Sequence, residues 1–98
     1  MPKGYWVAHV EVKDANAYEA YRRANAAAFE KFGARFLVRG GVRELREGNA
    51  KKRTVVIEFP SYPDALACYD SPEYQAAKAL RDPVSEGDMV IVEGYDSE

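Results

Sequence analysis

The pattern of apolar positions along the chain predicts four strands. Residues 52–60, KRTVVIEFP, form a β-branched and aromatic run that ends at a proline, which is typical of a strand buried near the middle of a sheet. Residues 5–12, YWVAHVEV, alternate between two faces and predict another strand. We expect two further strands over residues 35–44, RFLVRGGVRE, and 87–95, GDMVIVEGY. Paired glycines interrupt the former and indicate a bulge.

A long helix is predicted between the first two strands. Residues 17–32, AYEAYRRANAAAFEKF, have high helix propensity, and either Asp14 or Asn16 is the expected N-cap. Gly33 suits the position just past the helix end, where a left-handed conformation is easiest for glycine. The side chains that recur at steps of three and four, and that we expect on the buried face, are Tyr18, Tyr21, Asn25, Ala28, Phe29 and Phe32. The charged residues that we expect to point mostly away are Glu19, Arg22, Arg23, Glu30 and Lys31.

Two shorter helices are predicted before the last strand. Ser61 is followed three residues later by an aspartate, which is the spacing of a helix start, so we expect a helix over residues 63–70. Ser71 is the expected cap of a second helix in residues 71–81, SPEYQAAKALR, where a proline and a glutamate suit the first turn. The proline at position 83 stops this helix.

The order of these elements leads to a fold class. Strand, helix, two strands joined by a turn at residues 46–52, helices and a last strand give the order βαββαβ. With right-handed crossovers this is an α+β, ferredoxin-like arrangement, in which four antiparallel strands carry the helices on one face. No linker or repeat interrupts the pattern, so we expect residues 1–98 to form a single domain.

The helices cover only one face of such a sheet, and side-chain alternation predicts what covers the other. The helix-facing set is nearly all apolar, namely Trp6, Ala8, Val10, Val12, Phe36, Val38, Val55, Ile57, Phe59, Val90 and Val92. The opposite set mixes Tyr5, Val7, Leu37, Val56, Met89 and Ile91 with His9, Glu11, Arg39, Thr54, Glu58 and Glu93. This mixed face is too apolar to leave in water, and a second copy packed face to face would cover it. We therefore expect a homodimer that forms a dimeric α+β barrel.

Composition and charge exclude several classes of function. A net charge of -2 and a pI near 5.5 give no electrostatic basis for binding nucleic acid or an anionic membrane surface. The basic residues 51–53 are interpreted as solvating a turn. One cysteine, Cys68, and one histidine cannot form a disulfide or the three or four nitrogen and sulfur ligands of a typical zinc or iron site. With no apolar leader and no run of membrane length, we expect a cytoplasmic protein.

Several blocks of the sequence resemble a known family. PKGYW, RFLVRGG, VVIEFPSY, ALACYDSPEYQAAKALR and GDMVIVEGYD are similar to the small bacterial proteins of the domain of unknown function 1330 family, within the dimeric α+β barrel group. The resemblance covers residues 2–96 and implies the ferredoxin-like fold and the dimer. It implies no reaction. The wider barrel group includes cofactor-free monooxygenases that act on aromatic polyketides, muconolactone-type isomerases and haem-binding proteins, but none of their catalytic motifs is matched here.

His9, Arg39 and Glu58 are the first candidate site, on the mixed face of the first three strands. A histidine and a carboxylate can share general acid–base work while an arginine holds an anionic substrate. The structural alternative is that these groups pair with one another at the dimer interface. The paired glycines leave the strand phase open, so Arg39 could lie on either face.

Tyr18, Tyr21 and Asn25 are the second candidate site, on the buried face of the long helix. A buried amide must find partners or bind something, and aromatic hydroxyls beside it can line an apolar pocket between helix and sheet. The alternative is a set of core tyrosines whose hydroxyls reach the backbone or solvent. A separate candidate is the helix start at residues 71–74, where backbone N–H groups up to Tyr74 could bind an anion, although a helix cap also explains those residues.

These candidates lead to a functional hypothesis with two versions. The protein is expected to bind a small aromatic or acidic organic molecule, with Arg39, Tyr18, Tyr21, Asn25 and Tyr74 as ligand-binding residues. In the enzyme version, His9 or Glu58 is the catalytic base for cofactor-free acid–base, monooxygenase or isomerase chemistry. The alternative is a non-catalytic binding or interaction module whose polar residues are structural. No cofactor is expected, and the single histidine disfavours haem.

Overall fold

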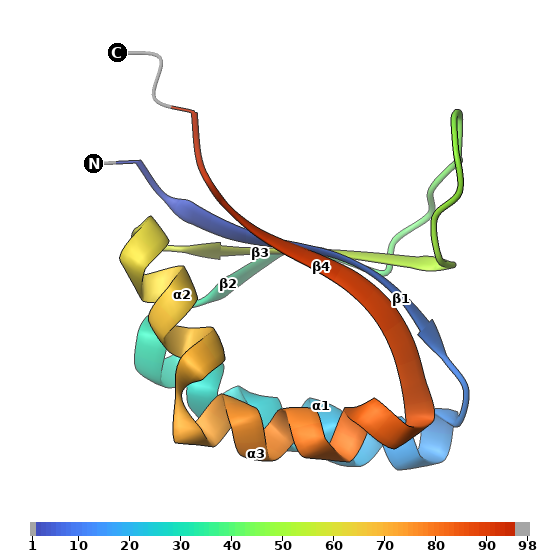
Figure 1. Ribbon diagram of the computed structural model, residues 1–98, viewed down its shortest axis with the longest axis horizontal. Coiled ribbons are helices and arrows are strands. Elements are labelled where there is room, and N and C mark those ends of the chain that lie inside the picture. Colours follow the sequence, from blue (N-terminus) through green and yellow to red (C-terminus); the bar gives the residue numbers. More distant parts are fainter. Residues whose placement is uncertain (1, 96–98) are drawn as a thin grey trace.

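A four-stranded antiparallel sheet carries all three α-helices on one face (Figure 1). The computed structural model describes residues 2–95. The elements are β1 (Gly4–Val12), α1 (Ala15–Phe32), β2 (Arg35–Arg39), β3 (Arg53–Phe59), α2 (Tyr62–Asp70), α3 (Pro72–Arg81), the 3-10 turn η1 (Asp82–Val84) and β4 (Ser85–Glu93). The strand order β2-β3-β1-β4 is that of the predicted ferredoxin-like fold, and β3 is an internal strand as its apolar run indicated.

Capping residues fix where the helices begin and where α1 ends. The Asp14 carboxylate accepts the Ala17 N–H at 3.1 Å, so Asp14 rather than Asn16 is the N-cap of α1. Gly33 ends this helix with φ at 71°, as its position predicted. The hydroxyls of Ser61 and Ser71 accept the backbone N–H three residues on, at 3.2 and 3.1 Å, and start α2 and α3. These caps aim α1 and α3 along the same face of the sheet.

An aromatic cluster centred on Trp6 forms the core between sheet and helices. Trp6 is 2% exposed, and its ring contacts four others with centroid distances of 4.8 to 5.9 Å, those of Phe29, Phe59, Tyr69 and Tyr74. Its indole N–H donates to the Ala65 carbonyl at 2.9 Å, which ties β1 to α2. The core therefore fills one end of the space between the layers and leaves the other end to polar side chains.

The predicted phase of the last strand is wrong. In the register of β4 on β1, Ile91 lies opposite Trp6 and Met89 opposite Ala8, so these two residues face the helices. Val90 and Val92, which alternation had placed toward the helices, are exposed on the open face. The reason is that residues 89–92 are apolar at every position, so alternation alone cannot assign a face.

The second predicted strand is also corrected. β2 ends at Arg39 instead of residue 44, and its register shifts between Phe36 and Val38, which makes Leu37 the extra residue of a bulge. The bulge places Arg39 opposite Val55, on the helix-facing side, and turns Val38 to the open face. Residues 40–52 form an arm that projects on the open side of the sheet, away from the helices (Figure 1).

Cys68 gives a testable pH dependence of stability. Its thiol is fully buried in α2, donates to the Ala28 carbonyl at 3.8 Å, and burial raises its pKa from 9.0 to about 12. Because the pKa is raised in the folded state, the neutral thiol contributes fully to the stability of the fold below about pH 9. This contribution is lost as pH rises toward 12. We expect the free energy of unfolding in urea to fall over this range by up to about 1.4 kcal/mol per pH unit from this group. Cys68→Ala should make the dependence shallower, and an unchanged slope would contradict the assignment.

Candidate functional site

A cavity of about 60 Å³ lies between α1, the end of α3 and the helix-facing side of the sheet. The side chains and glycine that line it are Val10, Tyr18, Tyr21, Arg22, Asn25, Phe29, Phe36, Arg39, Arg53, Val55, Ile57, Arg81, Ser85 and Gly87. Since about 10–15 Å³ of such space holds one water molecule, the cavity has room for a small organic group. Two of the lining residues, Arg39 and Gly87, are exposed, so the cavity is not closed off from solvent.

The buried stripe of α1 supplies one wall. Tyr18, Tyr21 and Asn25 follow one another at steps of three and four, and all three are buried and line the cavity. Asn25 is 4% exposed, so its amide faces the cavity in place of solvent. The second predicted site is therefore brought together as one surface, while its binding role stays a prediction.

Four arginines distinguish this cavity from a simple packing gap. Arg22, Arg39, Arg53 and Arg81 all line it, and no aspartate or glutamate does. Two of them have acidic partners outside the cavity, since Arg22 pairs with Glu19 at 3.1 Å and Arg81 with Asp82 at 3.2 Å. Within residues 2–95, Arg39 and Arg53 form no ion pair.

Arg39 and Arg53 are held at the cavity by the sheet. The Arg39 guanidinium stacks over the Phe36 ring at 4.0 Å, an arrangement that only the bulge at Leu37 allows for residues three apart on a strand. Arg53 lies opposite Val10 on β1, and its buried Nε has no hydrogen-bond partner. A buried guanidinium N–H without an acceptor is costly, which points to an acceptor supplied by a ligand.

Gly40 packs directly on Arg53. A Cβ at position 40 would lie 2.7 Å from the Arg53 Nε, and Gly40 has φ at 72°, a conformation that side chains rarely adopt. Its N–H donates to the Thr54 carbonyl at 2.9 Å, which holds the start of the arm against β3. The predicted bulge at Gly40 and Gly41 is wrong, because the bulge lies at Leu37 and β2 ends before the glycines. Gly40 instead lets the backbone approach Arg53.

A chain of hydrogen bonds links Arg81, Tyr74 and Tyr21 at the wall of the cavity. Arg81 Nε donates to Tyr74 Oη at 3.2 Å, and Tyr74 Oη lies 2.8 Å from Tyr21 Oη. Burial raises the pKa of both tyrosines above the ordinary value, so both hydroxyls are neutral and can donate. Tyr74 does not line the cavity itself but supports Tyr21, which does.

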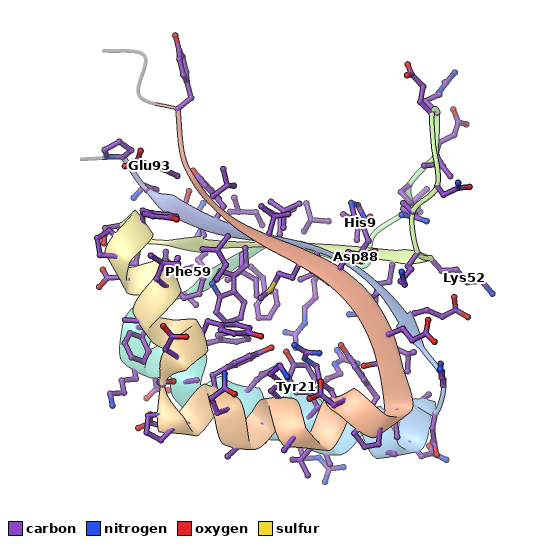
Figure 2. All side chains as sticks on the ribbon, in the orientation of Figure 1. His9, Tyr21, Lys52, Phe59, Asp88 and Glu93 are labelled. Atoms are coloured by element: carbon purple, nitrogen blue, oxygen red, sulfur yellow. The ribbon has the colours of Figure 1, made fainter. Side chains whose placement is uncertain are left out.

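The first predicted site is not brought together. Glu58 lies opposite Tyr5, and His9 lies opposite Thr54. His9 and Glu58 are therefore four residues, or about 13 Å, apart along the strands. Figure 2 shows His9 on the opposite side of the sheet from Tyr21. Glu58 accepts the Tyr5 hydroxyl at 3.0 Å, and His9 Nδ1 lies 3.0 Å from Thr54 Oγ1. Arg39, expected beside them, belongs to the cavity on the other face, because of the bulge in β2.

Sequence reasoning missed three of the four arginines. Arg22 was expected to point away from the buried face and Arg53 to solvate a turn, and Arg81 was not singled out. Arg53 shares strand parity with Val55 and Ile57, and this signal could have placed it on the helix-facing side. Arg22 and Arg81 gave no such signal, since helix flanks are ordinarily solvated. In the described part of the chain no helix is long and apolar enough to cross a membrane, and no three or more His, Cys, Asp or Glu side chains gather as metal ligands.

Comparison with solved structures supports the fold. A protein of unknown function from Rhodopseudomonas palustris is 17% identical with a TM-score of 0.75, over 97% of this chain and 84% of that one. A dimeric ferredoxin-like protein of unknown function from Thermobifida fusca is 19% identical with a TM-score of 0.62, over 94% and 91%. SnoaB, a cofactor-independent oxygenase from Streptomyces nogalater, is 12% identical with a TM-score of 0.65, over 99% and 97%.

The family assignment comes from the sequence. No curated protein is similar enough in sequence to match. The family model DUF1330, described as a domain of unknown function, matches residues 3–95. That span includes every residue that lines the cavity. The chain therefore belongs to the DUF1330 family.

Proposed function

We propose that the protein binds a small aromatic or acidic organic molecule in the cavity between α1 and the sheet. The observation that carries this proposal is the lining itself, which combines apolar and aromatic side chains with four arginines and no carboxylate. An apolar pocket with a few convergent polar groups is typical of small-molecule sites. The uncompensated positive charge selects an anion, and the rings of Phe29 and Phe36 favour a planar apolar body.

Arg39 and Arg53 are the proposed anion-binding residues. Both lack an acidic partner in the described chain, and the unpaired Arg53 Nε supplies a buried donor that a carboxylate oxygen would satisfy. Guanidinium and carboxylate match as planar, bidentate partners, whereas lysine would act only as a point charge. Arg22 and Arg81 are already paired to carboxylates and add positive potential rather than free donors.

Ligand binding is tested with benzoate as the probe and calorimetric titration as the measurement. We expect benzoate to bind and the neutral analogue benzyl alcohol to bind at least tenfold more weakly. Arg39→Ala and Arg53→Ala should each weaken benzoate binding by roughly ten- to 100-fold, since a hydrogen bond to a charged group contributes about 1.5–3 kcal/mol.

Arg23→Ala is the matched control for these variants. Arg23 is an exposed arginine of α1 that does not line the cavity, so its removal changes the net charge equally and should leave benzoate affinity unchanged. Equal weakening by all three variants would reduce the effect to overall charge and contradict an anion site in the cavity.

We propose that the protein is a homodimer joined through the open face of the sheet. Its exposed apolar side chains include Val90, which is 59% exposed, and Val92 on β4, with Leu37 and Val38 on β2 at the other edge of the sheet. The accessible surface of 6354 Å² exceeds the roughly 5,600 Å² expected for a monomer of this mass. The difference is close to the roughly 800 Å² that each partner buries in a standard interface.

The arm at residues 40–52 also supports a second copy of the chain on the open face. It projects on the open side of the sheet (Figure 1) and carries Val42, an apolar residue that is fully exposed. Arg43 holds the arm to the sheet by donating to Thr54 Oγ1 at 3.0 Å, the same hydroxyl that contacts His9. A second copy on the open face would bury both the valines of the sheet and this arm.

The dimer is tested by placing a charge on the open face. Val90→Asp should convert a dimer to a monomer at micromolar protein concentration, because each interface would bury two unpaired carboxylates. Sedimentation or native mass spectrometry measures the change. Leu80→Asp is the matched control, since Leu80 is an exposed apolar residue of α3 on the helix layer. A wild-type monomer, or dissociation by both variants, would contradict this interface.

The positions of His9 and Glu58 do not support their predicted role as catalytic bases for a ligand in the cavity. His9 and Glu58 lie on the open face with partners of their own, and the ligand cavity lies on the other side of the sheet. We propose that these two residues fix the pairing of the two subunits. Cofactor-free oxygenase or isomerase chemistry stays a second hypothesis for this protein, supported by its structural likeness to SnoaB, and it would have to use residues of the cavity.

A further inference from the structure

We infer that the Tyr21 hydroxyl is an oxyanion donor of this cavity, and that the ligand carries a phenolate or enolate oxygen at the end opposite its carboxylate. The inference rests on the proposed binding function and narrows its ligand class to small aromatic acids with a second, acidic oxygen, such as a hydroxybenzoate. Its basis is the directed chain of donors from Arg81 through Tyr74 to Tyr21.

The buried end of the chain fixes the direction of its hydrogen bonds. A guanidinium has no acceptor, so Arg81 Nε donates to Tyr74 Oη. Tyr74 is 1% exposed, and within residues 2–95 the only acceptor within reach of its own proton is Tyr21 Oη at 2.8 Å. If Tyr21 donated to Tyr74 instead, the Tyr74 proton would be buried without an acceptor, at a cost of about 1–3 kcal/mol. The arrangement that leaves no proton buried away from the cavity is therefore Arg81 to Tyr74 to Tyr21.

The proton of Tyr21 is left to point into the cavity. In this arrangement Tyr21 Oη accepts the hydrogen bond of the Tyr74 hydroxyl. With its oxygen used as an acceptor and its side chain in the cavity wall, Tyr21 has its own proton left to donate to whatever fills the cavity. A buried hydroxyl aimed at a ligand needs an acceptor there.

The chain also makes Tyr21 a strong donor. It begins at a guanidinium, which lies 5.7 Å from the Tyr21 ring, and each hydrogen bond polarises the next in a site shielded from water. Such a donor stabilises an oxygen in proportion to its negative charge, so it favours phenolate over phenol and enolate over ketone. The Arg39 and Arg53 side chains line the same cavity and take the other negative end.

The test uses para-nitrophenol, whose phenolate absorbs visible light and whose neutral form does not. A spectrophotometric pH titration gives the pKa of the phenol bound to the protein. We expect the bound pKa to be about one unit below that of the free phenol, which corresponds to tenfold tighter binding of the phenolate. Tyr21→Phe should abolish the shift, and Tyr74→Phe should remove part of it while Tyr21 remains.

Tyr62→Phe is the matched control. Tyr62 is a half-buried tyrosine of α2 that does not line the cavity, so this variant should keep the wild-type shift. Should Tyr21→Phe fail to fold, the pKa shift is measured in Tyr74→Phe and Arg81→Met, because each interrupts the hydrogen-bonded chain before Tyr21. An unchanged shift in these variants would overturn the inference.

The outcomes separate this inference from the proposed function. If benzoate binds and responds to Arg39→Ala, but the bound para-nitrophenol has its free pKa, the anion site stands and the oxyanion donor is refuted. If neither benzoate nor para-nitrophenol binds to the wild-type protein, the proposed function itself is refuted, and this inference with it.

Discussion

Replacement of Trp6 by alanine is expected to lower the free energy of unfolding by about 3–5 kcal/mol. Trp6 is the centre of the core, in contact with four aromatic rings, and its removal leaves a cavity that rigid neighbours cannot close. It also leaves the Ala65 carbonyl without its indole donor. A loss of this size approaches the whole stability of a domain of 98 residues.

Chemical denaturation followed by circular dichroism measures this loss. Tyr95→Ala is the control, since Tyr95 is an exposed aromatic residue and its truncation should change the free energy of unfolding by less than about 0.5 kcal/mol. A loss below about 1 kcal/mol for Trp6→Ala would mean that the aromatic cluster is not the stabilising core.

Replacement of Gly4 by alanine is expected to cost about 3 kcal/mol, although it adds a single methyl group. A Cβ at this position would lie 2.6 Å from the Ser61 carbonyl oxygen and 2.7 Å from the Tyr62 Cα. Both atoms belong to the backbone at the capped start of α2, so neither can move aside as a side-chain end could. The strain falls on the junction of β1 and α2.

Gly41→Ala is the matched control for this substitution. A Cβ at Gly41 meets no atom within 4 Å, and its φ lies outside the left-handed region, so the same chemical change should be neutral or slightly stabilising. Equal effects of the two substitutions on the denaturation midpoint would show that the tight contact at Gly4 is relieved by movement of α2.

Local signals were sufficient for most of the fold. The caps at Ser61, Ser71 and Gly33 follow from single residues whose chemistry fixes the backbone around them. Strand phase could not be predicted where the sequence does not alternate, as in residues 89–92. There the face is decided by pairing with β1, a long-range contact that a local pattern does not encode.

The candidate site was predictable only on its helical wall. Tyr18, Tyr21 and Asn25 were found because a polar amide in an apolar stripe is unusual enough to need a reason. Arg39 was named as a ligand-binding residue, with its face left open, but the other three arginines were missed because a charged residue on a strand end or a helix flank is ordinarily solvated. Their common feature is convergence on one cavity from separate elements, and this is a property of tertiary structure alone.

The bulge at Leu37 makes the place of Arg39 in the cavity depend on how one extra residue of β2 is accommodated. Deleting Leu37 would remove the extra residue and leave Arg39 opposite Val55, whereas pairing Leu37 as a regular strand residue would turn Arg39 to the open face of the sheet. A guanidinium would then leave the cavity and enter a surface of valines. In this edge strand, the way in which one extra residue is accommodated decides which face of the sheet carries the guanidinium.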